Sequence, residues 1–207
     1  MNFRNFIYSI AALLFLAPVV FRAQTAAELT RDLEHVYNNA AAVELSFSFA
    51  GEKCSMTIGP KNGSYRILAG DEQFIGDGHT AWHVLSKKHQ VLIDNISKNN
   101  QSVTATALLD FSANYDATTS ATKNGNILTL TPHASIASIF KEAGNIHTIS
   151  FLLKGSGKKL HIVSITATSN DGDKKLGNLK IKTLKSAPSS LFSYTAPKGY
   201  TVTDLRD

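Results

Sequence analysis

The sequence predicts a mainly β (α+β) fold, with a large antiparallel sheet and little helix, on three observations. Apolar and polar residues alternate along many short segments, as they do in strands that bury one face. Turn pairs that contain glycine, such as Asp77-Gly78, separate these segments at hairpin spacing. A long amphipathic helix pattern occurs once after residue 23, at 25–40. With so little helix to cover it, the apolar face of the sheet is expected to have another role.

The stretch 74–94 carries the clearest strand rhythm. Gly78 accepts the positive φ that a tight turn needs, because it has no Cβ to clash. After this turn Trp82 and Val84 occupy one phase of an alternating segment, so both are expected on the same side of a strand. A second turn at 86–89 leads into another alternating segment. The stretch therefore predicts a β-meander.

The remaining elements follow in chain order. Thr25 and Glu28 form a capping box at the start of the first helix, whose apolar stripe includes Leu29 and Leu33. A second helix is expected at 103–111, either as ordinary core packing or as a movable cover. Residues 135–143 are expected to form one or two helical turns. Outside the meander, strands are expected at 43–50, 54–58, 65–67, 127–131, 148–153, 160–166, 176–184 and 191–195.

The first 23 residues form a segment of a different kind. Arg4 precedes an apolar run at 7–20, which is short for a membrane span and fits the apolar region of a secretory signal peptide. We expect a signal peptide at 1–23, with cleavage between Ala23 and Gln24, and a single domain over 24–207. The expected product is a soluble exported protein, and an uncleaved N-terminal anchor is the alternative.

Charge and cysteine content bound the classes of function. Removing residues 1–23 takes away Arg4 and Arg22 and no acidic residue, so 19 basic and 16 acidic side chains remain, a net charge of +3. This mild balance does not predict nucleic-acid binding. The lysines gather at turns, where we expect them to be hydrated or, alternatively, to attract anionic headgroups weakly. Cys54 is the single cysteine, so no intrachain disulfide forms and a buried thiol is expected.

No motif predicts catalysis or a metal site. His79 and His83 would lie about 13 Å apart along an extended strand, which is too far for both to bind one ion. The chain has no Gly-x-Ser-x-Gly elbow, phosphate-binding loop or His-Glu-x-x-His pattern. We therefore expect no catalytic residue, no metal and no cofactor, in a protein that is not an enzyme.

Three segments together resemble the periplasmic outer-membrane lipoprotein carrier (LolA-like) family. Residues 77–82, DGHTAW, are similar to the family's Asp-Gly-x-x-x-Trp. Residues 130–132, LTP, are similar to its Leu-x-Pro strand end. Residues 192–204, FSYTAPKGYTVTD, are similar to its closing Phe-x-Phe-x-x-Pro-x-Gly-x-x-Val-x-Asp. Their order and spacing cover nearly the whole chain after residue 23.

The resemblance implies a strongly curved antiparallel sheet that forms an incomplete barrel, covered by an N-terminal helix and short lid helices. It implies a carrier or chaperone in the periplasm of a Gram-negative bacterium. Such a carrier binds lipoprotein acyl chains in an apolar cavity and shuttles them from the inner to the outer membrane. The implied partners are an inner-membrane lipoprotein-releasing transporter and an outer-membrane acceptor. The carrier itself is expected to be a monomer that binds no nucleic acid.

The resemblance also points to candidate site residues. Many family members have an arginine directly before the proline that corresponds to Pro60, and this arginine latches the lid when the cavity is empty. Here that residue is Gly59, so Lys61 or Arg66 is the candidate replacement. The candidate lid residues are Ala107, Leu108, Leu109 and Phe111. The candidate cavity lining comprises Leu45, Phe47, Phe49, Met56, Ile58, Tyr65, Ile67, Phe74, Trp82, Val84, Leu128, Ile149 and Phe151.

Two other classes of function remain as alternatives. One is an envelope binding or sensor protein for another hydrophobic ligand on the same fold. Analysis of material extracted from the purified protein separates it from the lipoprotein carrier. The other is an envelope hydrolase, which a His or Ser poised beside a carboxylate in the cavity would favour.

Overall fold

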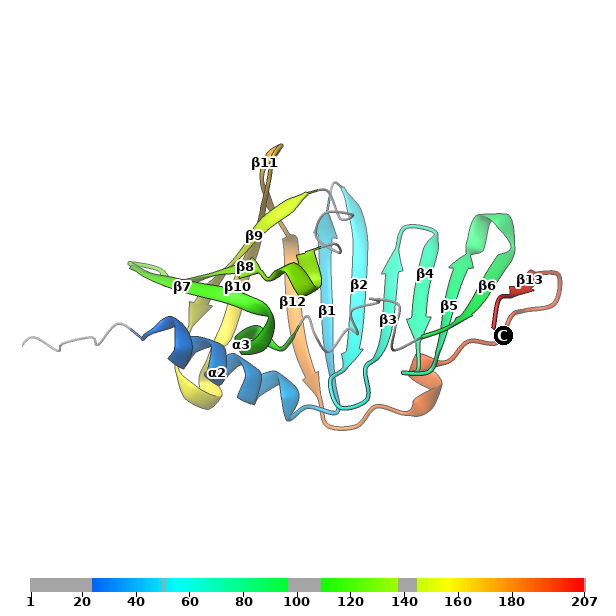
Figure 1. The fold of residues 1–207 in the computed structure, drawn as a ribbon, viewed down its shortest axis with the longest axis horizontal. Coiled ribbons are helices and arrows are strands. Elements are labelled where there is room, and N and C mark those ends of the chain that lie inside the picture. Colours follow the sequence, from blue (N-terminus) through cyan, green and yellow to red (C-terminus); the bar gives the residue numbers. More distant parts are fainter. Residues whose placement is uncertain (1–23, 50, 97–108, 138–144, 207) are drawn as a thin grey trace, which may run out of the picture.

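The computed structural model describes residues 24–49, 51–96, 109–137 and 145–206, and within them the chain is mainly β. Two sheets and a few short helices make up the fold (Figure 1). The eight-stranded sheet has the order β12-β1-β2-β3-β4-β5-β6-β13, and the five-stranded sheet has the order β11-β10-β9-β8-β7. Neighbouring strands pair antiparallel, except that β13 runs parallel to β6. The predicted fold class, mainly β with antiparallel strands, is confirmed.

The elements have the following bounds. The eight-stranded sheet comprises β12 (Gly177–Leu184), β1 (Ala42–Phe49), β2 (Glu52–Gly59), β3 (Ser64–Ala69), β4 (Glu72–Gly76), β5 (Thr80–Leu85), β6 (Gln90–Asn95) and β13 (Thr201–Asp204). The five-stranded sheet comprises β11 (Gly172–Lys175), β10 (His161–Ser169), β9 (Ile146–Lys154), β8 (Gly125–Pro132) and β7 (Tyr115–Thr122). The helical elements are α2 (Ala26–Asn38), α3 (Phe111–Asn114), η1 (Ser86–Lys88), η3 (Gly157–Lys159) and η4 (Ser189–Phe192). Residues 134–137 are also helical, which agrees with the helical turn expected at 135–143, and residues 138–143 lie outside the described part.

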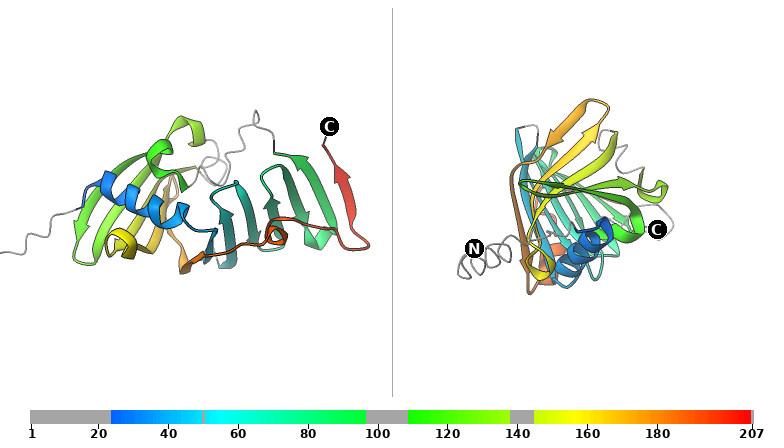
Figure 2. Two further views of the ribbon diagram at one scale, coloured as in Figure 1. Left: turned by 90° about the horizontal axis from the view of Figure 1, so that it is seen from below. Right: turned by 90° about the vertical axis from the view of Figure 1, so that its left-hand side faces the viewer.

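Helix α2 begins at the predicted capping box. Thr25 Oγ1 accepts a hydrogen bond from Glu28 N at 3.2 Å, and Glu28 Oε2 accepts one from Thr25 N at 2.9 Å. The two bonds satisfy backbone amides that the first helical turn leaves without partners. Leu29, Leu33 and Tyr37 on one face of the helix are buried against the five-stranded sheet. The apolar stripe thus fixes α2 across the side of the molecule between the sheets (Figure 2).

The eight-stranded sheet has two distinct faces. Leu45 lies opposite Met56, Met56 opposite Ile67, and Ile67 opposite Phe74, so all four side chains share what we call the inner face. Residues at the intervening positions project from the other, outer face.

The C-terminal segment covers part of the outer face. Ile75, Val84 and Val91 are fully buried there, in a small cluster with Trp82, Tyr194 and Tyr200. Burying each aliphatic side chain of this kind stabilises the fold by roughly 1.5–3 kcal/mol. Figure 2 shows the C-terminal segment, in orange and red, running along the eight-stranded sheet to its far edge. There β13 adds to β6, so the C-terminal segment and the meander form one packing unit.

The main core lies between α2, the five-stranded sheet and the inner face of β12, β1 and β2. The backbone amide of Leu176, between β11 and β12, donates to the carbonyl oxygen of Ile165 on β10 at 3.0 Å. This bond ties the two sheets together where the chain passes from one to the other. Within the described residues, no helix is long and apolar enough to cross a membrane.

Some predicted elements differ from the structure. The strand expected at 191–195 is wrong, because the segment forms η4 and then packs Phe192 and Tyr194 against the eight-stranded sheet. Its alternation reflects this packing, and the last strand forms later, at β13. Strand β7 had no counterpart in the prediction, because its Thr- and Ala-rich sequence has little apolar alternation. Of the helix expected at 103–111, residues 103–108 lie outside the described part, and α3 begins at Phe111.

Candidate apolar ligand pocket

A pocket of about 180 Å³ opens between the two sheets, beneath α3. The side chains that line it are aliphatic, thioether or aromatic, and none carries a charge: Tyr37, Val43, Leu45, Met56, Ile58, Leu109, Phe111, Tyr115, Leu130, Ile149, Phe151, Ile162, Ile165 and Ile181. Such a lining favours hydrocarbon.

Strand register explains how distant segments converge on the pocket. On the eight-stranded sheet, Leu45 of β1 lies between Ile181 of β12 and Met56 of β2. On the five-stranded sheet, Phe151 of β9 lies opposite Ile165 of β10. Because directly opposed residues share a face, each sheet presents an apolar row to the other.

A β-bulge adds one more residue to this lining. Register shifts between Ile162 and Ser164 on β10, so Ile162 opposes Leu153 while Ile165 opposes Phe151. Strict alternation would place Ile162 and Ile165 on opposite faces, because they are an odd number of residues apart. The extra residue in the bulge restores both to the pocket side.

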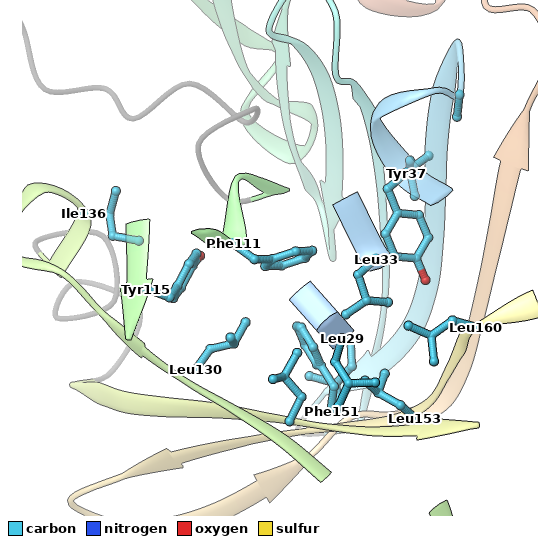
Figure 3. Packing of buried hydrophobic residues seen from close by; sticks show 14 residues of the cluster. Leu29, Leu33, Tyr37, Phe111, Tyr115, Leu130, Ile136, Phe151, Leu153 and Leu160 are labelled. Atoms are coloured by element: carbon cyan, nitrogen blue, oxygen red, sulfur yellow. The ribbon is translucent and has the colours of Figure 1, made fainter. Parts of the chain in front are cut away.

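Helix α3 closes one side of the pocket with an aromatic ring. The Phe111 ring centroid lies 5.8 Å from that of Phe151, edge to face, and 6.2 Å from that of Tyr115. Figure 3 shows Phe111 between Tyr115 of β7 and the α2 residues Leu33 and Tyr37. The ring is 3% exposed, so it fills interior space beside the pocket.

Side-chain hydrogen bonds, and not a long helix, hold α3 in place. Glu34 Oε1 on α2 accepts from both Ser112 N and Ser112 Oγ, each at 2.7 Å. Asp110 Oδ1 accepts from Ala113 N at 3.1 Å, which caps the helix. His133 Nδ1 lies 3.2 Å from the carbonyl oxygen of Ala113. Helix α3 has only four residues, so these bonds and the packing of Phe111 fix its position.

The two tyrosines of the pocket are held neutral. Burial raises the pKa of Tyr37 to about 12, against the opposing effect of a hydrogen bond with the backbone of Ile162. Burial also raises the pKa of Tyr115. Desolvation disfavours the charged phenolate, so both rings stay protonated and act as part of the apolar wall.

Several residues predicted for the cavity do line the pocket. They are Leu45, Met56, Ile58, Ile149 and Phe151, together with the lid candidates Leu109 and Phe111. Leu128 projects from the same face of β8 as Leu130 but is fully buried in the main core. Ala107 and Leu108 lie outside the described residues.

Five further candidates share a face with the pocket but lie beyond it. Phe47 and Phe49 follow Leu45 on the inner face of β1, and Tyr65, Ile67 and Phe74 continue that face across β3 and β4. Phe74 is 36% exposed, and its ring stacks on His83 with centroids 4.3 Å apart. The apolar inner face therefore continues past the five-stranded sheet as a half-exposed strip.

Two cavity candidates are on the wrong side of the sheet. Trp82 opposes Ile75, and Val84 opposes Gln73, so both project from the outer face. Val84 is fully buried there, and Trp82 packs against the same cluster. The prediction failed because alternation shows that two residues share a face without showing which face lines the cavity.

Neither candidate latch residue lies beside the pocket. Arg66 projects from the outer face, where its Nη2 lies 3.1 Å from Gln73 Oε1 and its Nη1 lies 3.5 Å from the Leu191 carbonyl oxygen. Lys61 is exposed in the turn between β2 and β3. Gly59 has no space for a side chain, because a Cβ there would clash with Ser64 Oγ and would lie 2.8 Å from Asn62 Oδ1. The Phe192 ring lies beside this position, at ordinary contact distance.

Seven residues that line the pocket were not among the predicted ones: Tyr37, Val43, Tyr115, Leu130, Ile162, Ile165 and Ile181. Tyr37 and Val43 had a usable signal, since they belong to the apolar stripe of α2 and the alternation of β1. Ile162 and Ile165 had none, because the bulge is invisible to a period-two pattern.

The histidines and Cys54 do not form a site. His83 Nε2 pairs with Glu72 Oε2 at 2.8 Å beside Phe74, away from the pocket. Desolvation and the nearby Glu52 carboxylate raise the pKa of the Cys54 thiol, which disfavours the reactive thiolate. Across the described ranges, no three His, Cys, Asp or Glu side chains gather as a metal ion would require.

Neither a scan against protein-family models nor a search of curated proteins finds a match to this chain. The pocket and the three sequence segments are therefore the features that bear on its function.

Proposed function

We propose that this protein is a periplasmic carrier that binds lipoprotein acyl chains and shuttles them from the inner to the outer membrane. The observation that carries the proposal is the uncharged pocket of about 180 Å³ between the sheets. A well-packed domain leaves few voids larger than a water molecule, so an apolar space of this size is unusual unless it is used. In this proposal the protein carries its ligand without catalysis, metal or cofactor.

The proposed architecture is an incomplete barrel. The hydrogen bond between Leu176 and Ile165 supports it, because it joins the two sheets at β10 and β12. The apolar row that runs from Ile181 through Leu45 and Met56 to Phe74 also supports it. In the proposed architecture, the two sheets form one continuous inner surface that α2 and α3 partly cover.

The size of the pocket constrains the mechanism. A cavity of about 150 Å³ accommodates benzene, so about 180 Å³ accommodates roughly seven carbon atoms. Burying one methylene contributes roughly 0.8 kcal/mol, which gives on the order of 6 kcal/mol for that segment and 12 kcal/mol for a chain of about 16 carbons. A whole acyl chain therefore fits only when the cover moves aside. The lost packing of the cover then offsets part of the binding energy, which permits release.

The proposed cover is α3 with Leu109. The Glu34–Ser112 hydrogen bonds and the aromatic contact between Phe111 and Phe151 keep the cover over the pocket. In place of an arginine latch, a carboxylate on α2 thus holds the cover closed. Cargo would be received from an inner-membrane lipoprotein-releasing transporter and passed to an outer-membrane acceptor, by a carrier that works as a monomer.

A second candidate is an envelope binding or sensor protein for a smaller hydrophobic ligand. The volume of the pocket favours it, because about 180 Å³ suits a compact apolar molecule better than several acyl chains.

Mass spectrometry of bound material tests both functions. The full chain is expressed in a Gram-negative host, the protein is purified from the envelope without detergent, and bound molecules are extracted. Triacylated peptides support the carrier, and free lipids or sterol-like molecules support the second candidate. Protein that carries neither, and that binds neither when they are added, would contradict both.

A further inference from the structure

The end of the molecule at which α2 begins has an open groove of about 790 Å³. The groove lies between the β7–β8 turn, the end of β9 and the residue that precedes the capping box. Its polar lining includes Gln24, Lys123, Asn126, Lys154 and Ser156, and none of its lining residues is acidic. Figure 1 shows this end, where the β7–β8 turn and the start of α2 project together.

Four exposed lysines lie at this end of the molecule. Lys123 and Lys154 line the groove, and Lys158 and Lys159 lie in η3, which contacts α2. All four lysines are exposed, and within the described residues none of them pairs with a carboxylate. We call these four residues the basic end.

The two neighbouring carboxylates each accept a hydrogen bond from a backbone amide. Asp32 Oδ2 accepts from Gly157 N at 2.9 Å and lies 3.5 Å from Gln24 Nε2. Glu28 Oε2 accepts from Thr25 N in the capping box. Both carboxylates are half-buried, whereas the lysines extend into solvent. The surface presented at this end is therefore positive.

The charge at this end points to the kind of surface that it fits. Four exposed lysines gather here, and within the described residues no carboxylate pairs with them. A membrane with anionic headgroups complements such a surface, because each lysine near it adds electrostatic attraction.

We propose that the basic end docks on anionic phospholipid headgroups, with Lys123 and Lys154 binding lipid phosphates at the groove. Lys158 and Lys159 attract headgroups that lie within a Debye length of them, which is about 8 Å at physiological salt. Docking holds the far end of the eight-stranded sheet away from the bilayer. The inference goes beyond the carrier function and does not depend on what the apolar pocket binds.

Vesicle co-sedimentation tests the proposal on protein purified from the envelope after expression of the full chain. Vesicles of phosphatidylcholine with phosphatidylglycerol are compared with vesicles of phosphatidylcholine alone, at low and high salt. The test variant replaces the basic end by glutamine (K123Q, K154Q, K158Q and K159Q). The control variant makes the same charge change at four other exposed lysines, on or beside β11 and β12 (K175Q, K180Q, K182Q and K185Q). Melting temperatures verify that both variants fold.

The expected result is salt-sensitive binding to anionic vesicles, reduced at least about tenfold in the test variant, since each lysine near such a surface contributes about fivefold. The control variant should keep most of its binding. Equal losses in the two variants would overturn the proposal, because net charge alone would explain them. It is also overturned if vesicles do not bind while inorganic phosphate shifts NMR signals at the groove, because the site would then serve a free anion.

Discussion

Replacing Phe111 by alanine separates two roles that one ring has in this structure. The ring is 3% exposed and packs edge to face on Phe151. Truncating a buried phenylalanine typically costs about 3–5 kcal/mol, part of it from the cavity left behind. If the ring occupies ligand space, an acyl chain that binds the variant fills that cavity and recovers part of the lost packing.

We therefore expect F111A to be less stable than the wild type and to bind a long-chain fatty acid more tightly. Recovery of about 1.4 kcal/mol would tighten binding about tenfold. Chemical denaturation measures the free energy of unfolding, and titration with a fluorescent long-chain fatty acid measures the dissociation constant. The two effects have opposite signs, so a general loosening of the fold cannot produce both.

The matched control is the same substitution at Phe192. This ring is 4% exposed in η4, close to Gly59 and away from the pocket. F192A should lose comparable stability without any gain in affinity. The reasoning is refuted if F111A binds the fatty acid no more tightly than F192A does.

The remaining predictions concern the wall of the pocket, its cover and its tyrosines. Ile149→Asp places a charge in the pocket and should abolish fatty-acid binding. Ser150→Asp, the next residue on the same strand, projects from the opposite face and should bind normally in the same titration. Glu34→Ala removes the acceptor of both Ser112 bonds and should weaken the closed cover by about 1.5–3 kcal/mol. Faster amide hydrogen exchange at 112–114 would reveal this, and unchanged exchange would contradict it. Burial raises the pKa of Tyr37 from 10 to about 12, so the folded state holds its proton more tightly than the unfolded state does. The contribution of Tyr37 to the free energy of unfolding, about 3 kcal/mol, should be fully present below pH 10 and lost as pH rises toward 12. Denaturation curves at alkaline pH check this, and Tyr37→Phe should reduce the dependence, leaving the part that Tyr115 contributes.

Local chemistry made the start of α2 and the strands of the meander predictable. The Thr25–Glu28 capping box requires only two side chains three residues apart, and the structure has both bonds. Alternation placed Leu45 and Met56 correctly, because those strands keep a regular period and bury one face. These features depend on neighbours in sequence, which a single chain displays directly.

What the sequence could not predict depends on contacts between distant segments. Both faces of β5 carry large side chains, and only the return of the C-terminal segment decides that Val84 belongs to the outer core. The bulge after Ile162 shifts the phase of β10 by one residue, so a period-two pattern does not place Ile162 and Ile165 on the same face. The space for Phe192 beside Gly59 likewise depends on a contact across more than half of the chain.

Methyl NMR with a synthetic triacylated peptide tests the central claim most directly, because isoleucines lie both in the pocket and away from it. If acyl chains enter the pocket, methyl signals of Ile58, Ile149, Ile162, Ile165 and Ile181 should shift on titration. Signals of Ile75 and Ile93, in the outer cluster, should stay in place. Shifts confined to the outer cluster, or none at saturating peptide, would contradict the account.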